Sequence, residues 1–296
     1  MPEQEDTELD KAGLAELTKK RLVYAIPNME QVPVQKNVTY KTADGVELQM
    51  DVYHPIDLQR SSRRPAVIFV HGDAPPEFLK DAKDWGQYIS WGQLTAASGL
   101  IAITFNHRST EEFTKVYEVA SDIDDLINYV RNHAEALHID EDSICIWVGS
   151  AGGPFGLRAA MREASGFVQC IVSYYGFTDL KAHYDAFMEP TDKPQQSSPI
   201  LSNEDLEEFS ATHHLKARAK EIAPIFIARA GLDYLALNQS VDQFVREALA
   251  HNISIDLMNH PEGLHAFDIL NDDARSREII RATLEFIKAH LLKETT

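Results

Sequence analysis

Three short stretches of the chain carry residue types that could together perform nucleophilic chemistry. Ser150 lies in the glycine-rich sequence Gly-Ser-Ala-Gly-Gly, directly after an apolar run. Asp233 and His265 each follow a later apolar run, at 225–228 and 253–258. A serine hydroxyl becomes a nucleophile when a base takes its proton and a carboxylate orients that base. The residue types therefore predict a catalytic triad of Ser150, His265 and Asp233, provided that the fold brings the three loops together.

The elements that must position these residues are indicated by the hydrophobic pattern. Short, nearly continuous apolar runs, typical of strands that are covered on both faces, occur at 66–70, 100–105, 144–148, 170–172, 225–228 and 253–258. Apolar residues spaced as on amphipathic helices occur at 123–137, 241–248 and 280–291. Strands that alternate with such helices predict a doubly wound α/β fold with a mostly parallel sheet. Before them, Asp44-Gly45 between alternating segments predicts an antiparallel hairpin.

In an open parallel sheet, ligands bind beyond the carboxyl ends of the strands, which is where Ser150 is expected. A serine in a sharp turn between strand and helix has its hydroxyl clear of the sheet, and small neighbours are required there. The usual pattern is Gly-x-Ser-x-Gly, and this chain has Val148 at the first glycine position. We expect the backbone N–H groups of Ala151 and of Gly72 or Asp73 to form an oxyanion hole.

Two neighbours of this expected site are interpreted as structural. His71 is expected to orient the loop that carries Gly72 and Asp73, and only the backbone of Asp73 is expected to take part. Taken singly, Asp233 could be a helix cap and His265 a surface histidine, with His260 as a competitor. The chain order Ser, Asp, His, each at a strand end, favours the triad over these simpler interpretations.

The chain is expected to have two parts, a polar arm at 1–35, attached loosely or as a helix, and one domain at 36–296. The polar segment at about 178–215 contains prolines and is too long for an ordinary connection, which indicates a cap or a flexible insert. Aromatic and apolar residues that could line a substrate pocket are Tyr174, Tyr175, Phe187, Met188 and Phe209.

Composition excludes several classes of function. The net charge of −18 argues against binding of nucleic acid or anionic membranes, because both require a basic surface. No apolar run is long enough to cross a bilayer, and the acidic start differs from a signal peptide. Cys145 and Cys170 are interpreted as reduced core thiols. His213 and His214 lack further ligands at metal-binding spacing. A cytoplasmic protein without metal or cofactor is expected.

Taken together, these motifs resemble those of the α/β-hydrolase superfamily, and within it the dienelactone-hydrolase-like and small serine carboxylesterase groups. The resemblance rests on Val70-His71-Gly72, Ser150-Ala151-Gly152-Gly153, Gly231-Leu232-Asp233 and Gly263-Leu264-His265-Ala266-Phe267. It extends over about residues 38–292. It places the family's triad on Ser150, Asp233 and His265, and its oxyanion donors on Ala151 and the Gly72–Asp73 region. Dienelactone hydrolases proper have cysteine as nucleophile, so their substrate is not implied.

The function expected from these observations is hydrolysis of a small carboxylic ester through an acyl-enzyme. The same residues could instead cleave amides or peptides, or transfer acyl groups. A protein of this fold that binds a small molecule without catalysis is a further alternative, as is an interaction module that uses the acidic run at 204–208. A homodimer is possible if an apolar cap is exposed.

Overall fold

The computed structural model describes residues 11–59, 62–162, 166–187 and 201–292 of the 296-residue chain. Its strands are β1 (Val34–Ala43), β2 (Val46–Tyr53), β3 (Arg64–Val70), β4 (Ile101–Phe105), β5 (Ile139–Gly149), β6 (Val168–Tyr174), β7 (Ile225–Ala230) and β8 (Ile255–His260). Its α-helices are α1 (Lys11–Leu17), α2 (Pro76–Leu79), α3 (Gly86–Ala97), α4 (Val116–Asn132), α5 (Gly153–Met161), α6 (Leu180–Phe187), α7 (Asn203–Glu208), α8 (Ala211–Arg218), α9 (Leu235–Ala250), α10 (Phe267–Leu270) and α11 (Ala274–Leu291).

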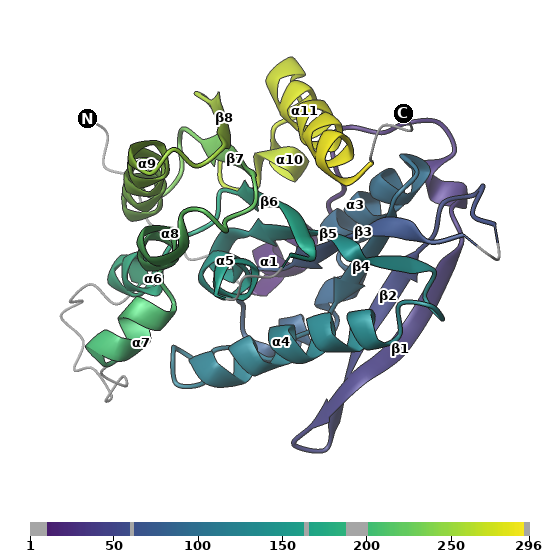
Figure 1. Ribbon diagram of the computed structural model, residues 1–296, viewed down its shortest axis with the longest axis horizontal. Coiled ribbons are helices and arrows are strands. Elements are labelled where there is room, and N and C mark those ends of the chain that lie inside the picture. The colour runs from purple at the N-terminus through teal and green to yellow at the C-terminus, as the bar shows by residue number, and fades with distance from the viewer. Residues whose placement is uncertain (1–10, 60–61, 163–165, 188–200, 293–296) are drawn as a thin grey trace.

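The strands form one sheet at the centre of the molecule (Figure 1), in the order β1-β2-β4-β3-β5-β6-β7-β8. β1 and β2 are antiparallel to each other, and β2 is antiparallel to β4. From β4 to β8 all neighbours are parallel. This arrangement confirms the predicted doubly wound fold and its N-terminal hairpin. Because the strands are parallel, the carboxyl ends of β3, β5, β7 and β8 meet at one edge of the sheet.

Helices cover both faces of the sheet, which is why its central strands are apolar on both sides. On one face α4, α5, α8 and α9 pack on the strands through residues such as Ile123, Leu157 and Phe244. On the other face α3 and α11 pack through residues such as Trp91 and Ile280. Cys145 and Cys170 are buried free thiols on the neighbouring strands β5 and β6, as expected.

The described part of the segment before the sheet, which was predicted as a loosely attached or helical arm, begins with α1 and then packs on the domain. After α1 the chain runs along α3, and Leu22, Met29 and Val32 are buried in the core on that face. The Leu22 N–H donates to the Ser90 hydroxyl at 3.0 Å, and the Val23 N–H donates to the Asp268 carbonyl at 2.9 Å. Only a few apolar residues make these contacts, so the overall polarity of the segment does not indicate them.

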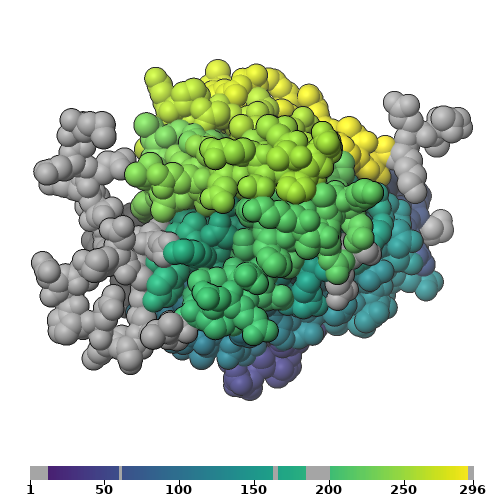
Figure 2. Space-filling view, turned by 60° about the vertical axis from the view of Figure 1, so that its left-hand side comes forward, coloured from purple at the N-terminus to yellow at the C-terminus, as the bar shows by residue number. Residues whose placement is uncertain are grey.

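The described part of the predicted cap at 178–215 is built into the helical layer rather than standing away from it. Its two ends are joined by backbone hydrogen bonds, from Leu180 to the Phe209 carbonyl at 3.0 Å and from Ala211 to the Thr178 carbonyl at 2.9 Å. Leu180, Phe209 and Leu215 are fully buried. In Figure 2, α8 (green) lies beside α9 (yellow-green) on one face of the molecule.

Candidate active site

The turn between β5 and α5 holds Ser150 in a strained conformation. Its backbone φ is +51°, a left-handed value that side chains rarely adopt outside sites where the surroundings impose it. The following glycines are required by close backbone contacts. A Cβ at Gly152 would lie 2.2 Å from the His71 carbonyl oxygen, and one at Gly153 would lie 2.0 Å from the Phe177 carbonyl oxygen. The turn is therefore clamped between the loops that follow β3 and β6.

Val148, the departure from the usual glycine pattern, is accommodated by a glycine elsewhere. Gly156 lies on α5, and a Cβ there would come within 2.4 Å of the Val148 Cγ1 atom. Val148 itself is fully buried. The close approach of strand and helix is thus preserved, with the small residue on the helix instead of the strand.

The structure brings the three predicted triad residues together. The Ser150 Oγ atom lies 2.8 Å from His265 Nε2, and His265 Nδ1 lies 2.9 Å from both carboxylate oxygens of Asp233. Nδ1 faces a carboxylate and therefore carries the ring proton, which leaves Nε2 to accept the hydrogen bond from the serine hydroxyl. The Asp233 side chain is fully buried, whereas the His265 side chain is 30% exposed. The His265 ring is thus open to solvent while the Asp233 carboxylate is not.

Backbone hydrogen bonds join the two loops that carry Asp233 and His265. The Gly231 N–H donates to the His260 carbonyl at 2.8 Å, and the Leu232 N–H donates to the Gly263 carbonyl at 2.9 Å. Gly231 has no space for a side chain, because a Cβ there would lie 2.3 Å from the Pro261 carbonyl oxygen. These contacts fix the acid and the base relative to each other through the main chain.

His260, the competitor for the role of base, lies away from Ser150 and braces the same loop. Its Nε2 atom is 3.1 Å from the Asp273 carboxylate and 3.1 Å from the Ser276 hydroxyl, at the start of α11. Its side chain is almost completely buried, and a Cβ at Gly263 would lie 2.7 Å from its ring. His260 therefore has a structural role, and Gly263 is required for its packing.

The loop after β3 lies opposite Ser150. A Cβ at Gly72 would lie 3.2 Å from the Ser150 Cβ and 3.6 Å from the Ala151 backbone nitrogen. His71 Nδ1 lies 2.7 Å from the Gly72 carbonyl oxygen, and His71 Nε2 accepts a hydrogen bond from the His107 N–H at 3.3 Å. His71 is therefore a neutral Nδ1–H tautomer, in keeping with burial, which lowers its pKa well below the usual range.

The orientation of this loop distinguishes the two predicted oxyanion donors. The Gly72 backbone lies beside Tyr88, where it opposes the rise in the pKa of Tyr88 caused by burial. In a trans peptide the N–H points opposite to the carbonyl, so the His71 contact with the Gly72 carbonyl also fixes the direction of the Asp73 N–H. Among the described residues, no backbone carbonyl accepts a hydrogen bond from the Asp73 N–H. Asp73 is thus the better placed donor.

The Asp73 carboxylate points away from the site, as expected. Its Oδ1 accepts from the Ser109 hydroxyl at 3.0 Å, and its Oδ2 accepts from the Thr110 hydroxyl. Directly after Thr110, three successive residues have left-handed backbone φ values of +45°, +56° and +67°, namely Glu111, Glu112 and Phe113. This strained turn links the oxyanion loop to α6, because the Phe113 ring packs edge-on against His183 at 4.8 Å.

The predicted pocket residues have different positions. Tyr174 is fully buried and hydrogen-bonds to Thr283, and Phe209 is fully buried against Phe155, so both are core residues rather than pocket walls. Their apolar character could not distinguish core from pocket. Tyr175 does lie at the site, with its ring 4.8 Å from that of His265. The Phe187 side chain and Met188 lie outside the described residues.

Sequence reasoning missed a polar cluster behind Tyr175. Asp268 is fully buried and accepts hydrogen bonds from Tyr175, Gln87 and Trp91. Burial raises the pKa of Asp268, and these three donors oppose that rise. The position of Asp268 three residues after His265 was the available signal, because a residue so close to the base in sequence must lie close to it in space.

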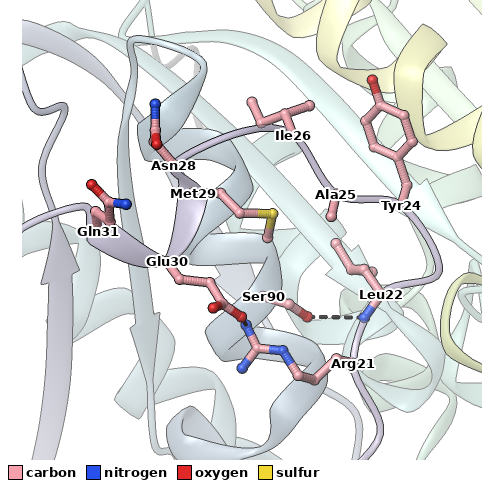
Figure 3. Close-up of a pocket in the computed structure, with 10 residues that line it drawn as sticks. All are labelled: Arg21, Leu22, Tyr24, Ala25, Ile26, Asn28, Met29, Glu30, Gln31 and Ser90. Atoms are coloured by element: carbon pink, nitrogen blue, oxygen red, sulfur yellow. Dashed lines mark hydrogen bonds and ion pairs between the residues drawn. The ribbon is translucent and has the colours of Figure 1, made fainter.

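Two surface hollows lie elsewhere. A cleft of about 290 Å³ lies between the N-terminal segment and α3 (Figure 3), lined by Arg21, Leu22, Tyr24, Ala25, Ile26, Asn28, Met29, Glu30, Gln31 and Ser90. A second, of about 490 Å³, lies nearby and is lined in part by Trp85 and Ile89. No triad residue lines either hollow. The open side of His265 is bordered instead by Tyr234, whose ring lies 5.7 Å away and which is 46% exposed.

The part of the chain that the structure describes lacks two features. No helix there is long and apolar enough to span a membrane. No group of three or more His, Cys, Asp or Glu side chains there is arranged to hold a metal ion.

The parallel sheet and the serine turn at its edge define the α/β-hydrolase class. The BD-FAE family model matches residues 50–247, about two thirds of the chain, and the chain belongs to this family of α/β-hydrolase-type esterases. Comparison with curated protein sequences finds no match.

Solved structures of esterase 2 from Thermogutta terrifontis share this fold. The native enzyme is 22% identical, with a TM-score of 0.68, and the match covers 91% of this chain and 97% of that chain. The butyrate-bound form is 20% identical, with a TM-score of 0.68 and coverage of 91% and 98%. The form phosphonylated by cyclosarin is also 20% identical, with a TM-score of 0.66 and coverage of 91% and 96%.

Proposed function

We propose that this protein hydrolyses small carboxylic esters, with Ser150 as nucleophile, His265 as base and Asp233 as acid. The observation that carries this proposal is the continuous chain of hydrogen bonds from the Ser150 hydroxyl through His265 to Asp233. Family membership supports it, as do the neighbouring structures of an esterase with butyrate bound and of the same enzyme phosphonylated by cyclosarin.

The first half of the reaction forms an acyl-enzyme. His265 Nε2 takes the hydroxyl proton as the Ser150 oxygen attacks the ester carbonyl carbon. The backbone N–H groups of Ala151 and Asp73 stabilise the negative charge that develops on the carbonyl oxygen. The bond to the alcohol oxygen then breaks, and the proton passes from His265 to the leaving alcohol.

The second half releases the acid. His265 takes a proton from a water molecule, whose oxygen attacks the acyl carbon and forms a second tetrahedral intermediate. When this intermediate collapses, the bond to Ser150 breaks, and the serine oxygen recovers its proton from His265. Asp233 holds the imidazole in its Nδ1–H tautomer and stabilises the imidazolium in both halves. Ser150, His265, Asp233 and the backbone donors supply the protein groups that act in these steps.

The proposal is tested by measuring hydrolysis of p-nitrophenyl esters, from acetate to octanoate, by the wild type and by Ser150→Ala. We expect the substitution to lower kcat by about 10⁴-fold or more without unfolding the protein. Ser254→Ala, at an exposed serine just before β8, is the matched control and should retain full activity. Unchanged turnover by Ser150→Ala would exclude Ser150 as the nucleophile.

The same assay distinguishes the alternatives. Faster cleavage of matched p-nitroanilides than of esters would favour an amide hydrolase, and transfer of the acyl group to added alcohols in preference to water would favour an acyltransferase. A folded wild type that fails both to hydrolyse these esters and to react with a fluorophosphonate probe would favour a binding protein. Several finer predictions from sequence stay predictions: the dienelactone-hydrolase-like subgroup, a cytoplasmic location, a homodimer, and the absence of nucleic-acid and membrane partners.

A further inference from the structure

The imidazole of His265 packs against one buried aromatic ring. Its two nitrogen atoms are held by Ser150 and Asp233, but hydrogen bonds at the ring edge leave the tilt of the ring to be set by packing. Tyr175 packs on it with ring centroids 4.8 Å apart and an interplanar angle of 58°. Tyr175 is 3% exposed, whereas Tyr234, the other ring near His265, is 46% exposed. The buried ring is therefore the one able to restrict the imidazole.

Tyr175 is itself held at both its backbone and its hydroxyl. Its N–H donates to the Ala228 carbonyl at 2.8 Å, and its backbone φ of +37° is a strained value. Its hydroxyl donates to Asp268 Oδ1 at 2.7 Å and accepts from Gln87 Nε2 at 2.6 Å. A strained conformation persists only where the surroundings over-determine it, as these contacts do.

Asp268 anchors this arrangement as an acceptor at both oxygens. Besides Tyr175, its carboxylate accepts from Gln87 Nε2 and Trp91 Nε1, each at 2.9 Å, and both donors lie on α3. An indole N–H can only donate, and the Tyr175 hydroxyl already uses its oxygen as an acceptor toward Gln87. The donors therefore suit a carboxylate rather than a protonated acid. Because Asp268 lies three residues after His265, the anchor and the base move as one unit.

From this geometry we propose that Tyr175 is a positioning residue for His265, held in place by the buried carboxylate of Asp268. Tyr175 exchanges no proton with the substrate. It restricts the imidazole to the orientation in which Nε2 faces Ser150 and Nδ1 faces Asp233. This inference rests on the proposed function in that it takes His265 to be the base. A small misplacement of a reacting group can lower a rate by up to 10²-fold.

The test compares Tyr175→Phe with Tyr174→Phe. The two residues are adjacent and buried, and each variant loses one buried hydroxyl group. The Tyr175 hydroxyl bonds to Asp268 and Gln87, whereas the Tyr174 hydroxyl bonds to Thr283 on α11, away from the base. We expect Tyr175→Phe to lower kcat for p-nitrophenyl butyrate by about 10-fold to 100-fold with KM changed less than about twofold. Tyr174→Phe should leave both constants within about twofold, although both variants lose some thermal stability.

A second readout needs no turnover. The His265 Nδ1 proton, hydrogen-bonded to Asp233, should give a low-field NMR resonance in the wild type and in Tyr174→Phe. In Tyr175→Phe the signal should broaden or move upfield, because a looser ring exchanges this proton with solvent. If wild type hydrolyses no ester but the resonance behaves this way, the ester-hydrolase proposal fails while the positioning proposal stands.

The positioning proposal is overturned if Tyr175→Phe keeps both the wild-type kcat and the resonance, or if the two variants lose kcat equally. Should Tyr175→Phe fail to fold, Asp268→Asn replaces it. That variant keeps the shape of the side chain and the Tyr175 ring, but it offers an amide where the Tyr175 hydroxyl or an α3 donor requires an acceptor. A fall in kcat and the same change in the resonance would support the proposal, and wild-type values of both would overturn it.

Discussion

The two sides of Ser150 are built in different ways. On the acid–base side, the loops after β7 and β8 are joined by main-chain hydrogen bonds, such as that from Leu232 to Gly263. On the oxyanion side, the loops after β3 and β4 are joined mainly through side chains. There the rings of His71 and His107 stack at 3.7 Å, and the Asp73 carboxylate binds the Ser109 hydroxyl.

This difference determines how each side responds to substitution. Main-chain hydrogen bonds do not depend on side-chain identity, so the relative position of acid and base tolerates changes in most neighbouring side chains. The oxyanion donors are backbone groups that no substitution removes, but their direction depends on side chains that substitution does remove. On the acid–base side, substitution of a few residues should therefore lower activity strongly. On the oxyanion side, many different substitutions should each lower activity moderately.

The buried titratable groups of the two sides make the stability of the protein depend on pH in opposite directions. Burial raises the pKa of Asp268 behind the base, so its folded-state pKa lies above the unfolded value and its contribution to stability is lost as pH rises. Burial lowers the pKa of His71 well below its usual range and that of His183, next to the oxyanion side, to about 3. Their contribution is complete above the unfolded pKa of 6.5 and is lost as pH falls.

The largest effect is expected at Asp233. Asp233→Asn places an amide beside His265 Nδ1 and so favours the wrong tautomer of the base. We expect kcat for p-nitrophenyl butyrate to fall by about 10⁴-fold with little change in fold. Asp256→Asn, at an exposed carboxylate on β8, is the control and should behave as wild type. A loss of less than about tenfold at Asp233 would mean that the base is oriented by other contacts.

A moderate effect is expected at His71. His71→Phe keeps a flat ring on His107 but removes the N–H that holds the Gly72 carbonyl, so the Asp73 N–H loses its fixed direction. We expect kcat to fall by about 10-fold to 100-fold, less than the loss of a whole oxyanion donor. His107→Phe alters the other ring of the stack and spares the Gly72 contact, so kcat should fall by less. Equal losses in the two variants would assign the effect to stacking.

The smallest effect concerns stability rather than rate. His183 lies between the rings of Phe113 and Phe177, and its pKa is lowered to about 3 by burial. Between pH 7 and pH 4.5, protonation of His183 in the unfolded state should therefore lower the free energy of unfolding of the wild type by roughly 2–3 kcal/mol. In urea titrations at these two pH values, the free energy of unfolding of His183→Phe should therefore fall by less than that of the wild type. An equal loss in the variant would show that His183 is already protonated in the folded protein.

The sequence was sufficient to predict the sheet and the approach of Ser150, Asp233 and His265 to one another. Strand periodicity and chain order carry that information, because parallel strands bring the loops that hold Ser150, Asp233 and His265 to one edge. The prediction failed for Tyr174 and Phe209, since an aromatic residue near the site can face the core or the substrate equally well in sequence. Asp268 was missed because a buried carboxylate is recognised by its donors, which come from distant segments.

The pairing of Val148 with Gly156 restricts the order in which this family can change its sequence. The usual turn has glycine on the strand, whereas here the glycine is on the helix and the side chain is on the strand. Alanine at 156 with Val148 still present would bring two carbons to about 2.4 Å, so that route is closed. A lineage that exchanges the two arrangements must therefore shorten the side chain at 148 before it places one at 156, with a transient void in the core. Relatives should show one arrangement or the other, and large residues at both positions should be absent.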